Sequence, residues 1–396
     1  MKIPKKFHRY KGEYALPQFF GTATEFAIEN MSVDDILNRF DCDFKSFEQH
    51  FDIEKISAFL KEKAESFPTE ILRRTYCPNP KCKRPMILRF HKNGAVPRKY
   101  HYCVVCRESH EIASFIGSHF PDWVLASIVS NAFQGKKPRE ILQSLQTEAT
   151  NRYLDFDEQN KLPDEKTLYD VISKIAEKLE KFNRLMILLI GGLHCTELLI
   201  DDAFVRRTRR RHRRNVRQGG LKRFYYAIVT IDRYKKFIID VYIASSRDES
   251  AFRVAFAKAK MMLSELPQIV KGDLLAAMIE AAEAYFPVNR VVHDFKKLKP
   301  WEKRERNVIE RRIRDLRKTL RKRQKCGSLA VQRNYATIAW IGQDYVKPME
   351  KALNNRSAAQ AVGIPYPFYP WDWRKLMIWI DWVFNNVSEI LRAGLK

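Results

Sequence analysis

Three acidic residues in the second half of the chain could act together in chemistry. Asp201 follows the apolar run Leu198–Ile200, Asp273 follows Gly272, and Glu310 lies in a long basic stretch. A charge within an apolar strand costs free energy unless it is paired or bound to a metal. Carboxylates suit Mg²⁺ or Mn²⁺, and two such ions about 3.5–4 Å apart can promote displacement at a phosphodiester. Because a lone acid is most simply a solvated surface group, this interpretation depends on all three.

The elements around these acids are predicted in a definite order. Apolar and β-branched runs predict strands over 197–205, 224–231, 237–244, 269–273 and 290–293. Apolar residues at helical spacing predict helices over 249–266, 274–285 and about 304–325. This is the order of a ribonuclease-H-like fold, a mixed five-stranded sheet with helices on both faces. Strand carboxyl ends, where Asp273 falls, are where open α/β sheets place their sites.

Two motifs around these acids resemble those of a known family. Ile200-Asp201-Asp202-Ala203-Phe204 is similar to an apolar-Asp-Glu-Thr-aromatic motif, and Asn307-Val308-Ile309-Glu310 to an Asn-x-Ile-Glu motif. On these motifs, the stretch from about Leu198 to Ile364 resembles the catalytic domain of DDE transposases of small prokaryotic insertion sequences, relatives of retroviral integrases. Asp201 takes the place of the first acid, and Asp202, which stands where the family usually has Glu, is the alternative.

Further positions agree with the same family. Ala227…Asp232 and Ser246-Arg247-Asp248 resemble two shorter motifs, and Arg314 and Arg317 stand at recurrent basic positions. The segment Asn354–Ala361 resembles the closing part of the domain.

The resemblance implies an enzyme that cleaves insertion-sequence ends and joins the freed 3′-hydroxyls to target DNA. Asp201, Asp273 and Glu310 would be its catalytic acids and would hold two Mg²⁺ or Mn²⁺ ions. Its partners would be the element ends, the target DNA and further copies of the chain, in a homodimer or higher oligomer. Two alternatives stay open: a non-catalytic DNA-binding protein derived from such an enzyme, and a nuclease of the same fold.

Four cysteines upstream predict a zinc ribbon over residues 71–118. Cys77 and Cys82 form one pair, Cys103 and Cys106 a second, and Asn93-Gly94 between them is a hairpin signal. Four thiolates at such spacings can surround one structural Zn²⁺. Unligated buried cysteines are the simpler alternative.

Residues 119–185 are predicted to be helical and to resemble a helix-turn-helix DNA-binding domain. A helix ending near Phe133 is followed by Gly135, a second helix begins at Pro138, and a third follows Pro163. A plain helical spacer would give the same pattern, because helix pairs are common.

The charge of the chain favours a nucleic-acid partner. Its formal net charge of +25 attracts polyanions, although a ribosome-associated or merely basic protein would share it. Six arginines are candidate phosphate contacts: Arg209, Arg210, Arg211, Arg306, Arg314 and Arg317.

The remaining segments carry no predicted chemistry. Residues 1–70 include a helical stretch from Ser32 to Phe67 with a capping-box-like start, and the catalytic domain is expected over 186–345. The C-terminal segment 346–396 is helical and aromatic, and packing in a core or oligomer contact is favoured over base stacking. With no secretory signal pattern and no long apolar run, the expected location is the cytoplasm, at the nucleoid.

Overall fold

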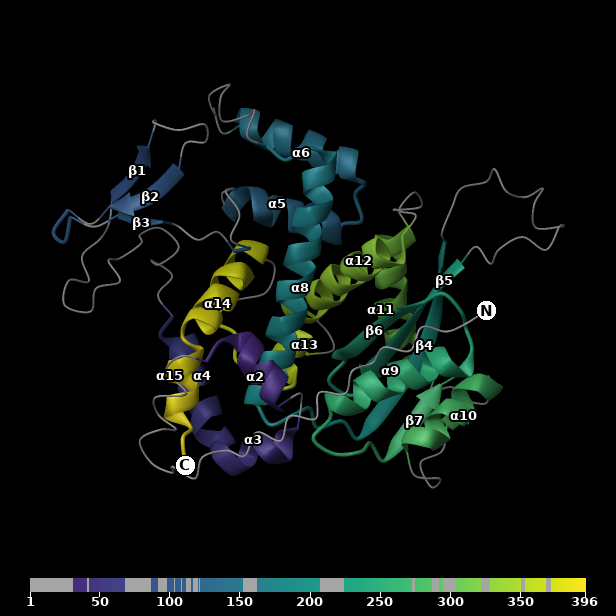
Figure 1. Ribbon diagram of the computed structural model, residues 1–396. Coiled ribbons are helices and arrows are strands. Elements are labelled where there is room, and N and C mark those ends of the chain that lie inside the picture. Colours follow the sequence, from purple (N-terminus) through teal and green to yellow (C-terminus); the bar gives the residue numbers. More distant parts are fainter. Residues whose placement is uncertain are drawn as a thin grey trace, which may run out of the picture.

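The structure is a computed structural model of the chain (Figure 1). It describes residues 31–40, 43–67, 87–91, 98–102, 104–107, 109–111, 115–116, 120, 122–151, 162–206, 224–272, 275–286, 292–294, 303–321, 328–349, 353–367 and 372–396.

The central sheet is mixed, with β4 in its middle. Strands β4 (Glu197–Arg206), β5 (Phe224–Asp232) and β6 (Ile238–Ala244) form an antiparallel meander. Beyond β4, the parallel strands β7 (Ile269–Gly272) and β8 (Val292–Asp294) complete the order β6-β5-β4-β7-β8.

Helices cover both faces of this sheet (Figure 1). Helix α9 (Glu249–Met261) connects β6 to β7, and α10 (Ala276–Tyr285) connects β7 to β8. Both cross between parallel strands in the same direction, so right-handed connections put them on one face, where they pack together. On the other face, α11 (Lys303–Arg321) packs on β4, and α12 (Leu329–Ile341) packs on β6 and α11.

A helical layer stands beside the sheet and is organised around α8 (Glu165–Leu189). Asp164 caps α8 by accepting a hydrogen bond from the Thr167 N–H at 2.6 Å. Its neighbours are α2 (Val33–Phe40), α4 (Ile53–Glu65), α5 (Asp122–Phe133), α6 (Pro138–Asn151), α12 and α14 (Trp373–Asn385). The layer also includes α3 (Phe44–His50), the π-helical turn η5 (Gly342–Val346), α13 (Ala358–Ala361) and α15 (Val387–Ala393).

One continuous apolar core joins the sheet to the helical layer. Its buried side chains extend from Val33 near the start of the described chain to Leu391 near its end. The aromatic C-terminal segment belongs to this core: Trp379 is fully buried and stacks on Trp382 with ring centroids 4.9 Å apart. The preference for packing over base stacking in this segment is therefore confirmed.

The mixed α/β class and the mixed sheet predicted from the sequence are confirmed. The helical stretch after Ser32 is three helices rather than one, because Asp43 and Asp52 each cap a new helix. Its predicted capping box is present, with the Asp35 N–H 3.2 Å from Ser32 Oγ and the Ser32 N–H 2.9 Å from Asp35 Oδ2. Helix α9 stops at Met261, short of the predicted 266. The domain boundaries stay predictions, and α8 runs past the one expected after 185 to Leu189.

In the part of the chain that the structure describes, no helix has both the length and the apolar character that crossing a bilayer requires.

Candidate active site

Asp201 lies in the central strand and points to the face covered by α11. An added Cβ at Gly272 would lie 2.8 Å from Ile200 Cγ2 and 2.7 Å from Met278 Cε, so Ile200 faces α10. Successive side chains of a strand point to opposite faces. Asp202 therefore shares the α10 face with Ile200, while Asp201, which is half-buried, points to the α11 face.

Asp202 is buried, and three of its groups form hydrogen bonds. Its Oδ1 accepts one from Arg247 Nη2 at 2.6 Å, just before α9 begins. Its carbonyl accepts one from Arg317 Nη2 of α11 at 3.3 Å. Its N–H donates to Asp201 Oδ1 at 2.8 Å. The last of these contacts holds the Asp201 carboxylate in place.

Strand β7 leads directly to Asp273, which lies outside the described residues. The last pair in the parallel ladder of β4 and β7 is Leu199 with Lys271. Asp201 follows Leu199 by two positions, and Asp273 follows Lys271 by two positions in the sequence. Asp201 and Asp273 therefore each come two residues after the last described pair between β4 and β7.

Helix α11 carries Glu310 and is buried along one apolar stripe, Ile313, Leu316 and Leu320. The Glu310 side chain is exposed. Arg317, seven residues later, lies on the same side of the helix because seven residues are close to two turns. Since Arg317 contacts the Asp202 carbonyl, this side of α11 faces the strand that carries Asp201.

A buried polar network fixes α11 against the sheet. Arg312 donates from Nη1 to the Gln343 carbonyl at 2.8 Å and from Nη2 to the Lys236 carbonyl at 3.0 Å. Arg312 Nη2 also lies 3.6 Å from Asp344 Oδ1, and Asp344 accepts a hydrogen bond from the Ile238 N–H at 3.1 Å. Burial raises the pKa of Asp344 to about 8, against the opposing effect of Arg312. The network joins α11, η5 and the β5–β6 turn.

A second charged cluster lies at the start of β4. Glu197 accepts hydrogen bonds from Tyr234 Oη at 2.8 Å and from Arg233, and pairs with Lys271 Nζ at 3.0 Å. Burial opposes ionisation of Glu197, but these three partners outweigh it and lower its pKa to about 2. Glu197 is therefore a structural anchor, ionised at neutral pH.

The described acids suit hard divalent cations in ligand type. Asp201 and Glu310 provide carboxylate oxygens from a strand and a helix that pack together, and the Asp202 N–H orients one of them. Within the described ranges, no group of three or more His, Cys, Asp or Glu side chains could hold a metal ion. Asp273, the third expected ligand, lies outside these ranges.

The predicted ribbon region contains a small antiparallel sheet. Strands β1 (Ile87–His91), β2 (Arg98–Tyr102) and β3 (Ser109–Glu111) pair in that order, which confirms the hairpin. Cys106 lies between β2 and β3 and is half-buried. Cys77, Cys82 and Cys103 lie outside the described residues, so the zinc site stays a prediction.

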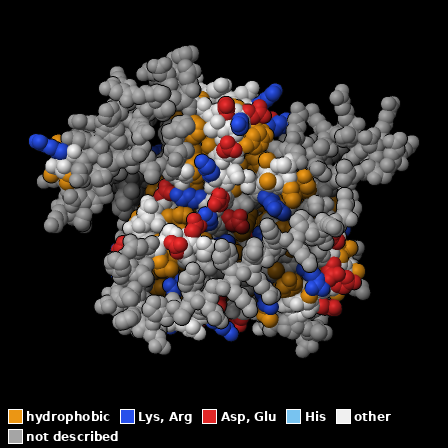
Figure 2. Space-filling model, viewed as in Figure 1, with side chains coloured by type: hydrophobic (Ala, Val, Ile, Leu, Met, Phe, Trp, Pro, Cys, Tyr) orange, Lys and Arg blue, Asp and Glu red, His pale blue; other side chains and the backbone are white. Residues whose placement is uncertain are grey.

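Of the predicted phosphate contacts, α11 carries three. Arg314 is exposed, Arg317 is half-buried against β4, and Arg306 lies on α11 with its side chain outside the described part. Arg209, Arg210 and Arg211 also lie outside it, in the segment that joins β4 to β5. On the face shown in Figure 2, described basic and acidic side chains are interspersed.

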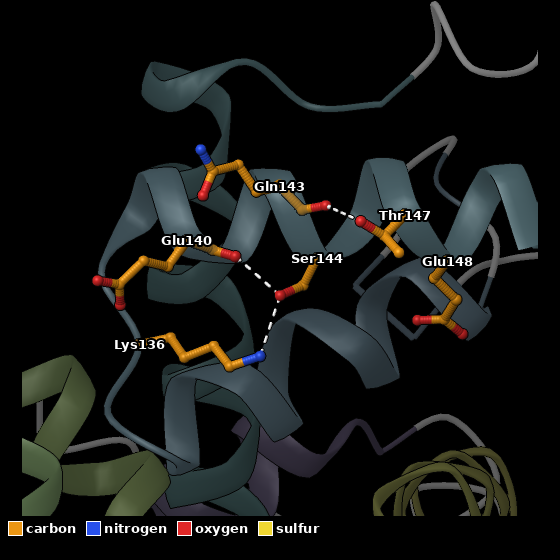
Figure 3. Close-up of a pocket in the computed structure, with 6 residues that line it drawn as sticks. All are labelled: Lys136, Glu140, Gln143, Ser144, Thr147 and Glu148. Atoms are coloured by element: carbon orange, nitrogen blue, oxygen red, sulfur yellow. Dashed lines mark hydrogen bonds between the residues drawn. The ribbon is translucent and has the colours of Figure 1, made fainter.

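A shallow hollow of about 480 Å³ lies along α6 and is lined by none of the predicted site residues that the structure describes (Figure 3). Lys136 Nζ donates to Ser144 Oγ at 3.0 Å, and Ser144 Oγ donates to the Glu140 carbonyl at 2.8 Å. Thr147 Oγ1 likewise donates to the Gln143 carbonyl at 3.0 Å. These polar groups bond within α6 and its preceding turn, so the hollow carries no chemical assignment.

Sequence reasoning did not assign the two arginines that organise this region. Arg247 was matched only as part of a motif, and the Arg312–Asp344 pair was not noticed. Strand alternation puts Asp201 and Asp202 on opposite faces and indicates that a buried Asp202 needs a partner, but it does not identify Arg247 as that partner. No sequence signal would have paired Arg312 with a residue so distant in the chain.

No protein-family model matches this chain, and no curated protein matches it.

Proposed function

We propose that this protein is a DNA transposase of the DDE type, with Asp201, Asp273 and Glu310 as its catalytic acids. The observation that carries the proposal is the position of Asp201. It is a half-buried carboxylate in the central strand, on the face packed by the helix that bears Glu310. Carboxylate oxygens from a strand and a helix that pack together are the ligand type that Mg²⁺ and Mn²⁺ prefer.

The arrangement of the sheet supports a ribonuclease-H-like core. An antiparallel meander is extended by parallel strands, α9 and α10 lie on one face, and α11 lies on the other. The same arrangement favours Asp201 over Asp202 as the first acid. Asp202 points to the opposite face, where its carboxylate pairs with Arg247 at 2.6 Å.

In this proposal each residue has a distinct task. Asp201, Asp273 and Glu310 hold Mg²⁺ or Mn²⁺, and the Asp202 N–H keeps Asp201 oriented. The chemistry that these ions supply when bound is activation of the attacking oxygen and stabilisation of the leaving oxygen. Arg314, exposed on α11, positions the phosphate backbone without reading bases.

The reaction consists of two displacements at phosphorus. Water first replaces the 3′-oxygen at the element's end, which leaves a 3′-hydroxyl there and a 5′-phosphate on the flanking strand. That hydroxyl then attacks a target phosphodiester, forming one P–O bond as another breaks. Because the protein forms no bond to phosphorus, its contribution is positioning and electrostatic stabilisation.

The upstream modules are proposed to recognise the element ends. Helices α5, α6 and the start of α8 form a compact unit, and the turn before α6 contains Gly135 at φ 76°. This agrees with a helix-turn-helix, whose short turn often contains glycine. The three-stranded sheet β1–β3 agrees with a ribbon that one Zn²⁺ would stabilise.

The test uses the full chain and the DNA that flanks its gene. Short inverted repeats should lie near both ends, and the purified protein with Mg²⁺ or Mn²⁺ should cut there and join the new 3′-hydroxyl to a second duplex. Cleavage without joining would instead identify a nuclease. Specific binding without cleavage would identify a non-catalytic DNA-binding protein.

A further inference from the structure

Two arginines from different elements contact the buried residue Asp202. It lies beside Asp201 but points to the other face of the sheet. Its side chain is held from α9's side by Arg247 at 2.6 Å, and its carbonyl from α11's side by Arg317 at 3.3 Å. Groups on both faces of the sheet therefore hold the same residue, one through its side chain and the other through its carbonyl.

The backbone of Asp202 also contacts the Asp201 side chain. Its N–H donates to Asp201 Oδ1 at 2.8 Å, so any shift of the Asp202 backbone moves one oxygen of the expected cation ligand. Leu199 is the last residue of β4 that pairs with β7, so no described ladder on that side holds the strand at Asp202. Arg247 and Arg317 contact β4 at Asp202, beyond the last described pair between β4 and β7.

We infer that Asp202, Arg247 and Arg317 form a clamp that positions Asp201 for binding a divalent cation. The inference rests on the proposed function. Asp202 acts through its backbone N–H, Arg247 by neutralising and anchoring the Asp202 carboxylate, and Arg317 by fixing the carbonyl. All three are positioning residues. Groups that orient a metal ligand typically change metal affinity by about 10–100-fold when removed.

The experiment measures binding of Mn²⁺ alone to the full chain, by the loss of the free-ion electron paramagnetic resonance signal. The variants are Arg247→Gln, Arg247→Lys and Asp201→Asn. Arg253→Gln is the matched control, since it removes the same charge from an exposed ion pair with Glu249 on α9. Arg247→Gln should weaken Mn²⁺ binding about tenfold, Arg247→Lys should be intermediate, and Arg253→Gln should match the wild type.

Arg247→Gln leaves Asp202 as a buried charge without this partner and could unfold the chain. The double variant Asp202→Ala with Arg247→Ala removes both groups, which costs far less stability than removing one. The clamp predicts that its melting temperature is close to that of the wild type while Mn²⁺ binding stays about tenfold weaker.

Two results would overturn the clamp and leave the proposed function intact. The first is wild-type Mn²⁺ affinity in Arg247→Gln. The second is a double variant in which both the melting temperature and the Mn²⁺ affinity return to those of the wild type. If the wild type does not bind Mn²⁺, or Asp201→Asn binds it equally well, the catalytic assignment fails and the clamp fails with it.

Discussion

The acids of β4 show how neighbours decide what a carboxylate does. Glu197 has three partners that keep it ionised, Asp202 is paired with Arg247, and Asp201 is half-buried beside α11. The first two have structural tasks that their contacts explain. Asp201 is proposed as the cation ligand of the three because it faces the helix that carries a second predicted acid.

Replacing Glu197 by Gln should destabilise the protein in a pH-dependent way. The pKa of Glu197 is lowered from 4.5 to about 2, so its contribution is fully present above pH 4.5 and is lost as pH falls toward 2. At pH 7 the substitution should cost roughly 2–4 kcal/mol of unfolding free energy. Urea unfolding at pH 7 and pH 3 measures this, and the difference from wild type should shrink at the lower pH.

The control for this prediction is Glu249→Gln. Glu249 forms an exposed ion pair with Arg253, which should contribute less than about 1 kcal/mol at either pH. An equal cost of Glu197→Gln at both pH values would contradict the assigned ionisation.

Single residues were predictable where their chemistry is local. Asp201 stood out because a charge interrupts an apolar run, and the stripe Ile313, Leu316 and Leu320 followed helical spacing. The partners Arg247 and Lys271 were not predictable, because they come from elements that are near β4 only after folding.

At the scale of elements, α11 both closes the site and presents charge. Its buried side is fixed by Arg312, and Arg317 reaches β4, while Arg314 remains exposed. A helix anchored so firmly can hold an exposed arginine at a defined place, as the proposed phosphate contact requires.

Arg314→Ala should weaken DNA binding for all sequences alike. Each lost phosphate contact lowers the slope of log affinity against log salt by roughly one. Filter binding over a salt series measures this slope, with Arg253→Ala as the control that removes an exposed arginine from α9. An altered base preference with an unchanged slope would contradict a phosphate contact.

Arg317→Ala should lower the stability of the protein as well, since Arg317 donates a hydrogen bond to the Asp202 carbonyl.

The β1–β3 sheet gives a second prediction at this scale. The full chain should hold about one Zn²⁺, and Cys106→Ser should lose it because a tetrahedral site would then lack one thiolate. Cys195→Ser is the matched control, since Cys195 is buried in the core next to β4. Atomic absorption after dialysis measures the zinc. Equal zinc content in both variants would refute the assignment to Cys106.

At the scale of the whole molecule, the two ends of the described chain are packed together. The Asp52 N–H donates to the Gly394 carbonyl at 2.6 Å, and Phe51 pairs with Leu395. This contact joins α4 to α15 and closes the helical layer around α8. It was not predicted, because contacts between distant segments leave no periodic pattern in a sequence.

Gly394→Ala should test this closure. An added Cβ would lie 2.4 Å from Ile56 Cγ1 and 2.9 Å from the Asp52 carbonyl, so the ends must separate slightly. Overpacking of this kind typically costs about 1–3 kcal/mol. Chemical denaturation measures it, with exposed Glu389→Ala on α15 as the control expected within about 0.5 kcal/mol of wild type. Unchanged stability in Gly394→Ala would show that the two ends do not pack as described.

The architecture of the sheet was largely predictable, whereas the site was predictable only in part. Alternating strands and periodic helices gave the element order, since both patterns are local. Helix ends such as that of α9, and the division of residues 32–67 into three helices, depended on caps that sequence spacing alone did not reveal. Which sheet faces Asp201 and Asp202 point to was established only by the position of Ile200 beside Gly272.

Asp201, Asp273 and Glu310 are proposed to carry out phosphodiester chemistry together. The most direct measurement is single-turnover cleavage of the element's end by Asp201→Asn, Asp273→Asn and Glu310→Gln, each compared with Glu249→Gln. Each of the three should lower the cleavage rate by about 10³-fold or more, because the lost group acts in the transition state. End binding and melting temperature should remain close to those of the wild type. A cleavage rate near that of Glu249→Gln in all three variants would contradict the account.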